Sequence, residues 1–132
     1  MHLLIVDDDK VARTVIKNHL MAMQPDCKIT EAENGAQALF LFFKKKPDFV
    51  FLDLMMPLVD GRAFLDVIKE CYRCGLQIKK PRLVLVTMLN NTQIDQICPL
   101  RDNPFIEAVI KKPVTKNKLK ALEELFPANN EN

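Results

Sequence analysis

Residues Val50 to Pro57 read VFLDLMMP, an apolar run that leads into a carboxylate. Three apolar residues lead directly into Asp53, and Pro57 closes the run. An ionised carboxylate beside an apolar run is unfavourable unless a partner group lies close to it. The stretch therefore predicts a buried strand that ends at a functional carboxylate.

Length and composition describe an ordinary globular domain. The chain has 132 residues, of which 48% are hydrophobic and 27% are charged, and this suits one domain with its own core. A net charge of +2 is too small to indicate binding to nucleic acid or to a membrane surface. Met1 leads almost directly into a strand-like segment without a signal peptide, and no apolar run reaches membrane-spanning length. A cytoplasmic location is therefore expected.

Apolar runs alternate with amphipathic segments along the whole chain. Helix starts are indicated by side chains that cap helices, at Asn34, Asp60, Asn90 and Thr115. The second predicted helix has an apolar stripe of Ala36, Leu39, Phe40 and Phe43. The predicted strands cover residues 3–6, 27–32, 49–52, 83–86 and 106–110.

Strict alternation of five strands with five helices indicates an α/β fold. Strands that are apolar along their length require helices on both faces of the sheet. The prediction is a doubly wound, five-stranded parallel sheet of order 2-1-3-4-5, a flavodoxin-like three-layer sandwich. The domain is expected over residues 1–127, followed by a polar tail over residues 128–132.

Polar residues follow four of the predicted strands. Asp7-Asp8-Asp9 follows the first strand, Asp53 the third, Thr87 ends the fourth, and Lys111-Lys112-Pro113 follows the fifth. The carboxyl ends of parallel strands meet at one edge, where ligands bind at the switch point of the strand order. Asp53 is therefore expected at a site on this edge.

The predicted group of side chains suits phosphoryl transfer. Repulsion between carboxylates is relieved by a divalent cation, and Mg²⁺ favours one or two carboxylates, a carbonyl and waters. A lysine and a threonine hydroxyl supply charge and a hydrogen bond for a phosphoryl group. An aspartate in this setting can attack phosphorus and form an acyl phosphate.

The motifs IVDDD, VFLDLMMPLVDG, LVLVT and IKKP resemble the receiver domain of two-component response regulators. The resemblance covers nearly the whole chain, with the motifs in order. It implies that Asp53 accepts a phosphoryl group from a histidine kinase or a histidine phosphotransfer protein. The domain then signals to an output partner, which is unknown. The resemblance also implies that the domain is not an enzyme, apart from catalysing its own phosphorylation and dephosphorylation.

Roles of individual residues follow from the same resemblance. Asp7, Asp8 and Asp53, with the backbone carbonyl of Met55, match the Mg²⁺ ligands. Thr87 and Lys112 match the residues that contact the phosphoryl group. A cis peptide bond is implied before Pro113.

Several nearby residues are expected to have ordinary roles. Asp9 is predicted to be a solvated loop residue or a helix cap rather than a metal ligand. Lys111 is predicted to face solvent because Lys112 occupies the motif position. Cys71 and Cys74 are spaced C-x-x-C, but no second pair or nearby His completes a zinc site. A packing or incidental role is predicted, and a redox pair is the less favoured alternative. Val109 stands where the family often has an aromatic residue.

Two other interpretations stay open at this point. Asp7-Asp8-Asp9 contains the D-x-D pattern of haloacid-dehalogenase-like phosphatases, although Lys10-Val11 follows instead of Gly-Thr. The second interpretation is a pseudo-receiver, an interaction module that is never phosphorylated. An FMN-binding protein is disfavoured because an acidic loop after the first strand repels phosphate.

Overall fold

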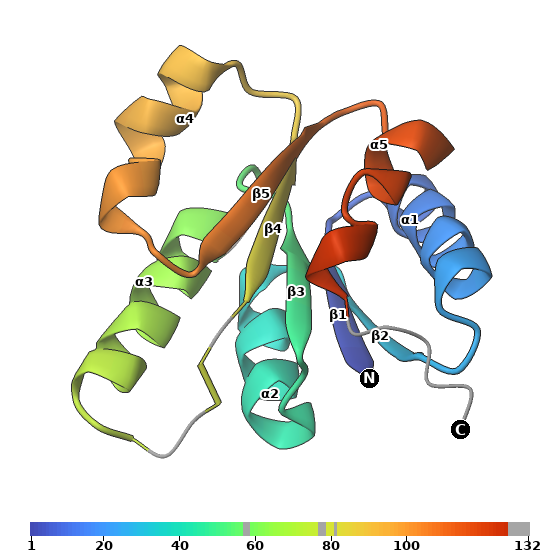
Figure 1. Cartoon of the computed structure of the whole chain (residues 1–132). Coiled ribbons are helices and arrows are strands. Elements are labelled where there is room, and N and C mark those ends of the chain that lie inside the picture. Colours follow the sequence, from blue (N-terminus) through green and yellow to red (C-terminus); the bar gives the residue numbers. More distant parts are fainter. Residues whose placement is uncertain (57–58, 77–78, 81, 127–132) are drawn as a thin grey trace.

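The computed structural model describes residues 1–56, 59–76, 79–80 and 82–126. Pro57 and the predicted tail at 128–132 therefore lie outside the described residues. The fold is a five-stranded sheet of order β2-β1-β3-β4-β5 in which every neighbouring pair is parallel (Figure 1). The strands are β1 (His2–Val6), β2 (Lys28–Ala32), β3 (Phe49–Leu52), β4 (Leu83–Thr87) and β5 (Ile106–Lys111). The predicted fold class and strand order are confirmed.

Short polar side chains start the helices, as the sequence predicts. Asn34, Asp60, Asn90 and Thr115 each accept a hydrogen bond from the backbone N–H three residues later, and Asp9 accepts one from Val11 N. Such caps satisfy N–H groups that have no partner within the helix. The α-helices are α1 (Lys10–Met23), α2 (Gly35–Lys45), α3 (Gly61–Arg73), α4 (Asn91–Ile97) and α5 (Lys116–Lys120), with 3-10 helices η1 (Leu100–Asp102) and η2 (Glu123–Leu125).

Two apolar cores, one on each face of the sheet, hold the helices in place. Successive strand residues point to opposite faces, so Leu52 joins the core beneath α2, α3 and α4, while Phe51 joins the core beneath α1 and α5. Figure 1 shows α1 and α5 on one side of the sheet and α3 and α4 on the other. The central strands are therefore buried on both faces, and polar groups are confined to their ends.

The predicted apolar stripe of α2 is wrong except at Leu39, which packs against the core. The helix buries Ala38 and Phe42, whereas Phe40 is 62% exposed and Phe43 is 39% exposed. Residues 38–43 are apolar without interruption, so several helical stripes compete and periodicity alone cannot choose the buried one. Contacts with α3 decide the outcome, since Phe42 packs edge-on against Phe64 at 6.0 Å between ring centroids.

Candidate functional site

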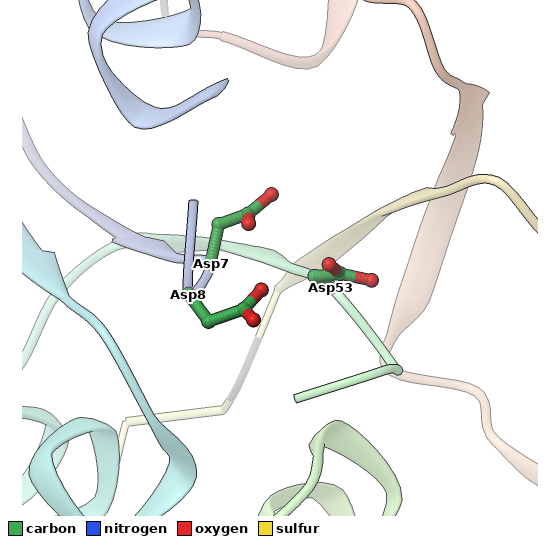
Figure 2. Close-up of side chains that lie close together, drawn as sticks. All are labelled: Asp7, Asp8 and Asp53. Carbon is green, nitrogen blue, oxygen red and sulfur yellow. The ribbon is translucent and has the colours of Figure 1, made fainter. Parts of the chain in front are cut away.

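Three aspartates come together at the carboxyl edge of the sheet. Asp7 and Asp8 directly follow β1 and Asp53 directly follows β3, and these two strands are neighbours. One carboxylate oxygen of each residue lies within 4.8 Å of the others, and Figure 2 shows the three side chains at the two strand ends. Asp7 and Asp53 are buried, and Asp8 is exposed. The group therefore combines two buried charges with one that faces solvent.

Lys112 lies between the two buried aspartates. Its ammonium Nζ is 2.7 Å from Asp7 Oδ2 and 3.1 Å from Asp53 Oδ2. The contact with Asp7 Oδ2 is a close ion pair, and no other donor among the described residues reaches this oxygen. Asp7 Oδ1, in contrast, accepts from Asp9 N at 2.9 Å. Three carboxylates thus share one ammonium, and the group keeps negative charge that a divalent cation would offset.

Burial controls the ionisation of Asp53. Loss of solvent raises its pKa, the Met55 N–H and Lys112 act to lower it, and Asp7 adds to the increase, so the net shift is upward. For Lys112, burial lowers the pKa, but Asp7 and Asp53 outweigh it and the net shift is also upward. The ammonium is therefore held in its charged form, while the Asp53 carboxylate is destabilised by its surroundings.

The backbone after β3 is fixed against the start of α3. Met55 N donates to Asp53 Oδ1 at 3.1 Å, and Gly61 N donates to Leu54 O at 3.1 Å. A Cβ at position 61 would lie 2.3 Å from the Asp53 carbonyl oxygen, so only glycine allows this approach. The N–H of Met55 therefore contacts the Asp53 carboxylate. That the backbone carbonyl of Met55 binds a metal stays a prediction.

Thr87 lies at the same edge but bonds to its own loop. Its side chain is fully buried, and Oγ1 accepts from Leu89 N at 3.1 Å. Lys112 N donates to Thr87 O at 2.9 Å, which joins the ends of β4 and β5. The structure therefore brings Asp7, Asp8, Asp53 and Lys112 into direct proximity, with Thr87 on the adjoining strand end. The peptide bond between Lys112 and Pro113 is cis, as the resemblance implied.

The contacts of two cations near the site were not predicted from the sequence. Arg13 of α1 donates through Nη1 to Asp7 O at 2.6 Å and pairs with Glu31 at 3.1 Å. Lys111 donates through Nζ to Leu89 O at 2.6 Å, so the prediction that it faces solvent is wrong. Both head groups bind backbone carbonyls, and a sequence carries no signal for such contacts.

The position expected for an aromatic residue holds a partly buried valine. Val109 packs against the core beneath α4 and lines a pocket of about 340 Å³ together with Ile94 and Leu100. A valine cannot swing between exposed and buried positions as a ring can. Any signal that passes from the site to α4 must therefore use the backbone or other side chains.

Comparison with known proteins decides the family. The model of the response regulator receiver domain matches residues 3–123. The chain belongs to this family. Its expected relationship to two-component response regulators is confirmed, and the phosphatase and FMN-binding alternatives are not supported.

Relatives and solved structures agree with this assignment. The nitrate/nitrite response regulator NarL of Escherichia coli K12 is 39% identical over 92 residues, which cover 69% of this chain and 39% of NarL. A CheY-like receiver domain from Methanospirillum hungatei is 25% identical with a TM-score of 0.71, covering 94% of this chain and 92% of that one. The response regulator TrrA of Thermotoga maritima, solved with Mg²⁺-BeF, is 26% identical with a TM-score of 0.71, covering 95% and 98%. The chain thus spans well under half the length of NarL.

Family membership gives the general function. Receiver domains of two-component systems take phosphoryl groups from histidine kinases, pass signals to output domains, and bind Mg²⁺ at an acidic pocket. They are signalling proteins rather than enzymes in the usual sense. In the part of this chain that the structure describes, no helix has both the length and the apolar character needed to cross a membrane.

Proposed function

We propose that Asp53 is the phosphoacceptor of this receiver domain. The observation that carries the proposal is the contact of Lys112 with both Asp7 and Asp53 beside the three-carboxylate group. Asp7, Asp8, Asp53 and the Met55 carbonyl would hold Mg²⁺. Thr87 and Lys112 would contact the phosphoryl oxygens.

The residues fit Mg²⁺ on the chemistry of the donor set. Oxygen ligands on a negatively charged edge suit a hard divalent cation, and the one ammonium that reaches Asp7 and Asp53 does not offset three carboxylates. When bound, Mg²⁺ supplies positive charge that offsets the charge of the carboxylates and the phosphoryl oxygens. The exposure of Asp8 beside buried Asp7 and Asp53 leaves one side of the group open to solvent.

The side chains position and activate the reacting groups. An oxygen of the Asp53 carboxylate attacks phosphorus, an O–P bond forms, and the P–N bond of the phosphohistidine donor breaks with its electron pair moving to the imidazole nitrogen. Before transfer, Asp53 is oriented by the Met55 N–H on one oxygen and by Lys112 on the other. Such fixed geometry is the main contribution that a protein makes to phosphoryl transfer. Lys112 neutralises charge that develops on the phosphoryl oxygens.

The phosphorylated domain then acts on a partner. The donor in this proposal is a histidine kinase or a histidine phosphotransfer protein, and the output partner is unidentified. Residues 1–127 form the receiver unit, with 128–132 as a polar tail. Catalysis extends only to the domain's own phosphorylation and dephosphorylation. The proposal places the domain in the cytoplasm, a compartment in which thiols such as its four free cysteines remain reduced.

Intact mass after incubation with acetyl phosphate tests the proposal. Wild type is expected to gain one phosphoryl group in Mg²⁺ and none in EDTA, and Asp53→Asn is expected to gain none. Asp48→Asn is the matched control because Asp48 also flanks β3 and also pairs with a lysine; it should gain the group as wild type does. If wild type binds Mg²⁺ but gains no phosphoryl group, the domain is a pseudo-receiver and the proposal is wrong.

A further inference from the structure

Lys111 fixes a loop that the phosphoryl-transfer site depends on. Lys111 is the cross-strand neighbour of Thr87 in the parallel pairing of β4 with β5. From there its ammonium reaches the loop between β4 and α4 and donates to Leu89 O at 2.6 Å. Hydrogen bonds from charged donors are the stronger ones in proteins, so this contact restrains Leu89.

Leu89 in turn orients the Thr87 hydroxyl. Leu89 N donates to Thr87 Oγ1 at 3.1 Å, so the hydroxyl oxygen acts as an acceptor. A hydroxyl has one proton to donate in addition to its acceptor lone pairs. Its proton therefore remains available for an oxygen at the site, in a direction limited by the Leu89 N–H. The position of Leu89 thus determines where Thr87 can donate.

Both ends of this arrangement are anchored. Beyond Leu89, Asn90 and Gln93 exchange side-chain and backbone hydrogen bonds at 2.9 and 2.8 Å, which fixes the start of α4. On the other side, Lys118 of α5 donates to Lys111 O at 2.9 Å. The Lys111 side chain therefore connects a fixed strand end to the one loop segment between Thr87 and the α4 cap.

We propose that Lys111 is a positioning residue for phosphoryl transfer, acting through Leu89 and Thr87. Its ammonium holds the Leu89 carbonyl, which keeps the Leu89 N–H on Thr87 Oγ1 and leaves the threonine proton directed at the phosphoryl group. Lys111 does not touch the reacting atoms. The inference rests on the proposed role of Thr87, and it adds a residue to which no role had been given.

The first test removes the ammonium while keeping most of the side-chain length. Lys111→Met is expected to lower the maximal rate of phosphorylation by saturating acetyl phosphate about fivefold, since small errors of position slow such reactions strongly. Its Kd for Mg²⁺, measured by calorimetry, should stay at the wild-type value. NMR hydrogen exchange should show a faster Leu89 N–H without any phosphodonor. Lys111→Arg should restore both readouts, and Lys116→Met, the same charge change at an exposed site on α5, should match wild type.

A double-mutant cycle decides whether Lys111 acts through Thr87. In a Thr87→Ala background, Lys111→Met is expected to change the phosphorylation rate no further, because the group that it positions is gone. Multiplicative effects of the two substitutions would overturn the proposal. So would a wild-type rate in Lys111→Met, whatever the exchange of Leu89 shows. If wild type itself gains no phosphoryl group, the proposed function fails and the role of Lys111 with it, an outcome distinct from failure of the lysine variant alone.

Discussion

Two aspartate–lysine pairs flank strand β3, one at each end, and they behave in opposite ways. Asp48 directly precedes the strand and pairs with Lys79, whereas Asp53 directly follows it and pairs with Lys112. The residue types are the same and the strand between them is only Phe49–Leu52. What differs is the surroundings that the fold gives to each carboxylate.

Exposure reverses the direction of the pKa shift. The side chain of Asp53 is 7% exposed and that of Asp48 is 35% exposed. Burial raises the pKa of both, but at Asp48 the Lys79 ammonium and the His2 N–H outweigh it and the pKa is lowered. At Asp53 burial outweighs Lys112 and the Met55 N–H, and the charge of Asp7 acts in the same direction as burial. At the amino end of β3 the surroundings thus stabilise the ionised form of Asp48. At the carboxyl end they destabilise the ionised form of Asp53, and a bound cation would offset this.

Removing the lysine from each pair gives the largest expected difference. Lys112→Met leaves Asp7 and Asp53 buried without their cation, and we expect the free energy of unfolding to fall by about 3 kcal/mol. Lys79→Met removes an exposed pair and is expected to lower it by less than about 1 kcal/mol. Urea denaturation in EDTA measures both. An equal decrease in the free energy of unfolding in the two variants would contradict the difference between the two ends of β3.

Mg²⁺ should stabilise one edge only. At a free concentration of ten times its Kd, a ligand that binds only the folded state adds about 1.4 kcal/mol to the free energy of unfolding. We expect this gain in wild type and in Lys79→Met. Asp8→Asn, which removes the exposed carboxylate of the group, should show little gain at the same Mg²⁺ concentration. Thermal unfolding with Mg²⁺ and with EDTA measures the effect, and an undiminished gain in Asp8→Asn would remove that residue from the ligand set.

The sequence predicted the carboxyl edge better than the helix faces. Asp7, Asp53 and Thr87 stand directly at strand ends, and parallel pairing must bring strand ends together, so their convergence followed from order along the chain. The stripe of α2 did not, because an uninterrupted apolar run leaves the buried face to tertiary packing. Phe40 was therefore predicted in the core and lies exposed.

The contacts of long cationic side chains could not be predicted from the sequence either. Lys111 and Arg13 bind backbone carbonyls of Leu89 and Asp7, and in a sequence they look the same as solvated lysines and arginines. The pairing of Lys79 with Asp48, 31 residues apart, was equally invisible. Whether such a head group reaches a partner depends on loop geometry, which periodicity and composition do not describe.

The smallest expected effect concerns the exposed pair and its dependence on pH. The pKa of Asp48 is lower in the folded state than in the unfolded chain, so the unfolded state binds more protons between the two values and stability rises with pH there. The contribution of Asp48 is therefore complete above the unfolded value of about 3.9 and is lost as pH falls through the folded value. Solvent screening limits it to about 0.5 kcal/mol.

Asp48→Asn isolates this contribution. The difference in free energy of unfolding between wild type and Asp48→Asn is expected to be constant from pH 7 to about pH 5 and to shrink below about pH 4. High salt should also reduce it at pH 7, because ions screen exposed charges. A difference that grows as the pH falls would mean that burial dominates at Asp48 as it does at Asp53. Burial would then raise the pKa at both ends of β3, and the raised pKa of Asp53 would no longer distinguish the proposed phosphoryl-transfer site from the opposite edge of the sheet.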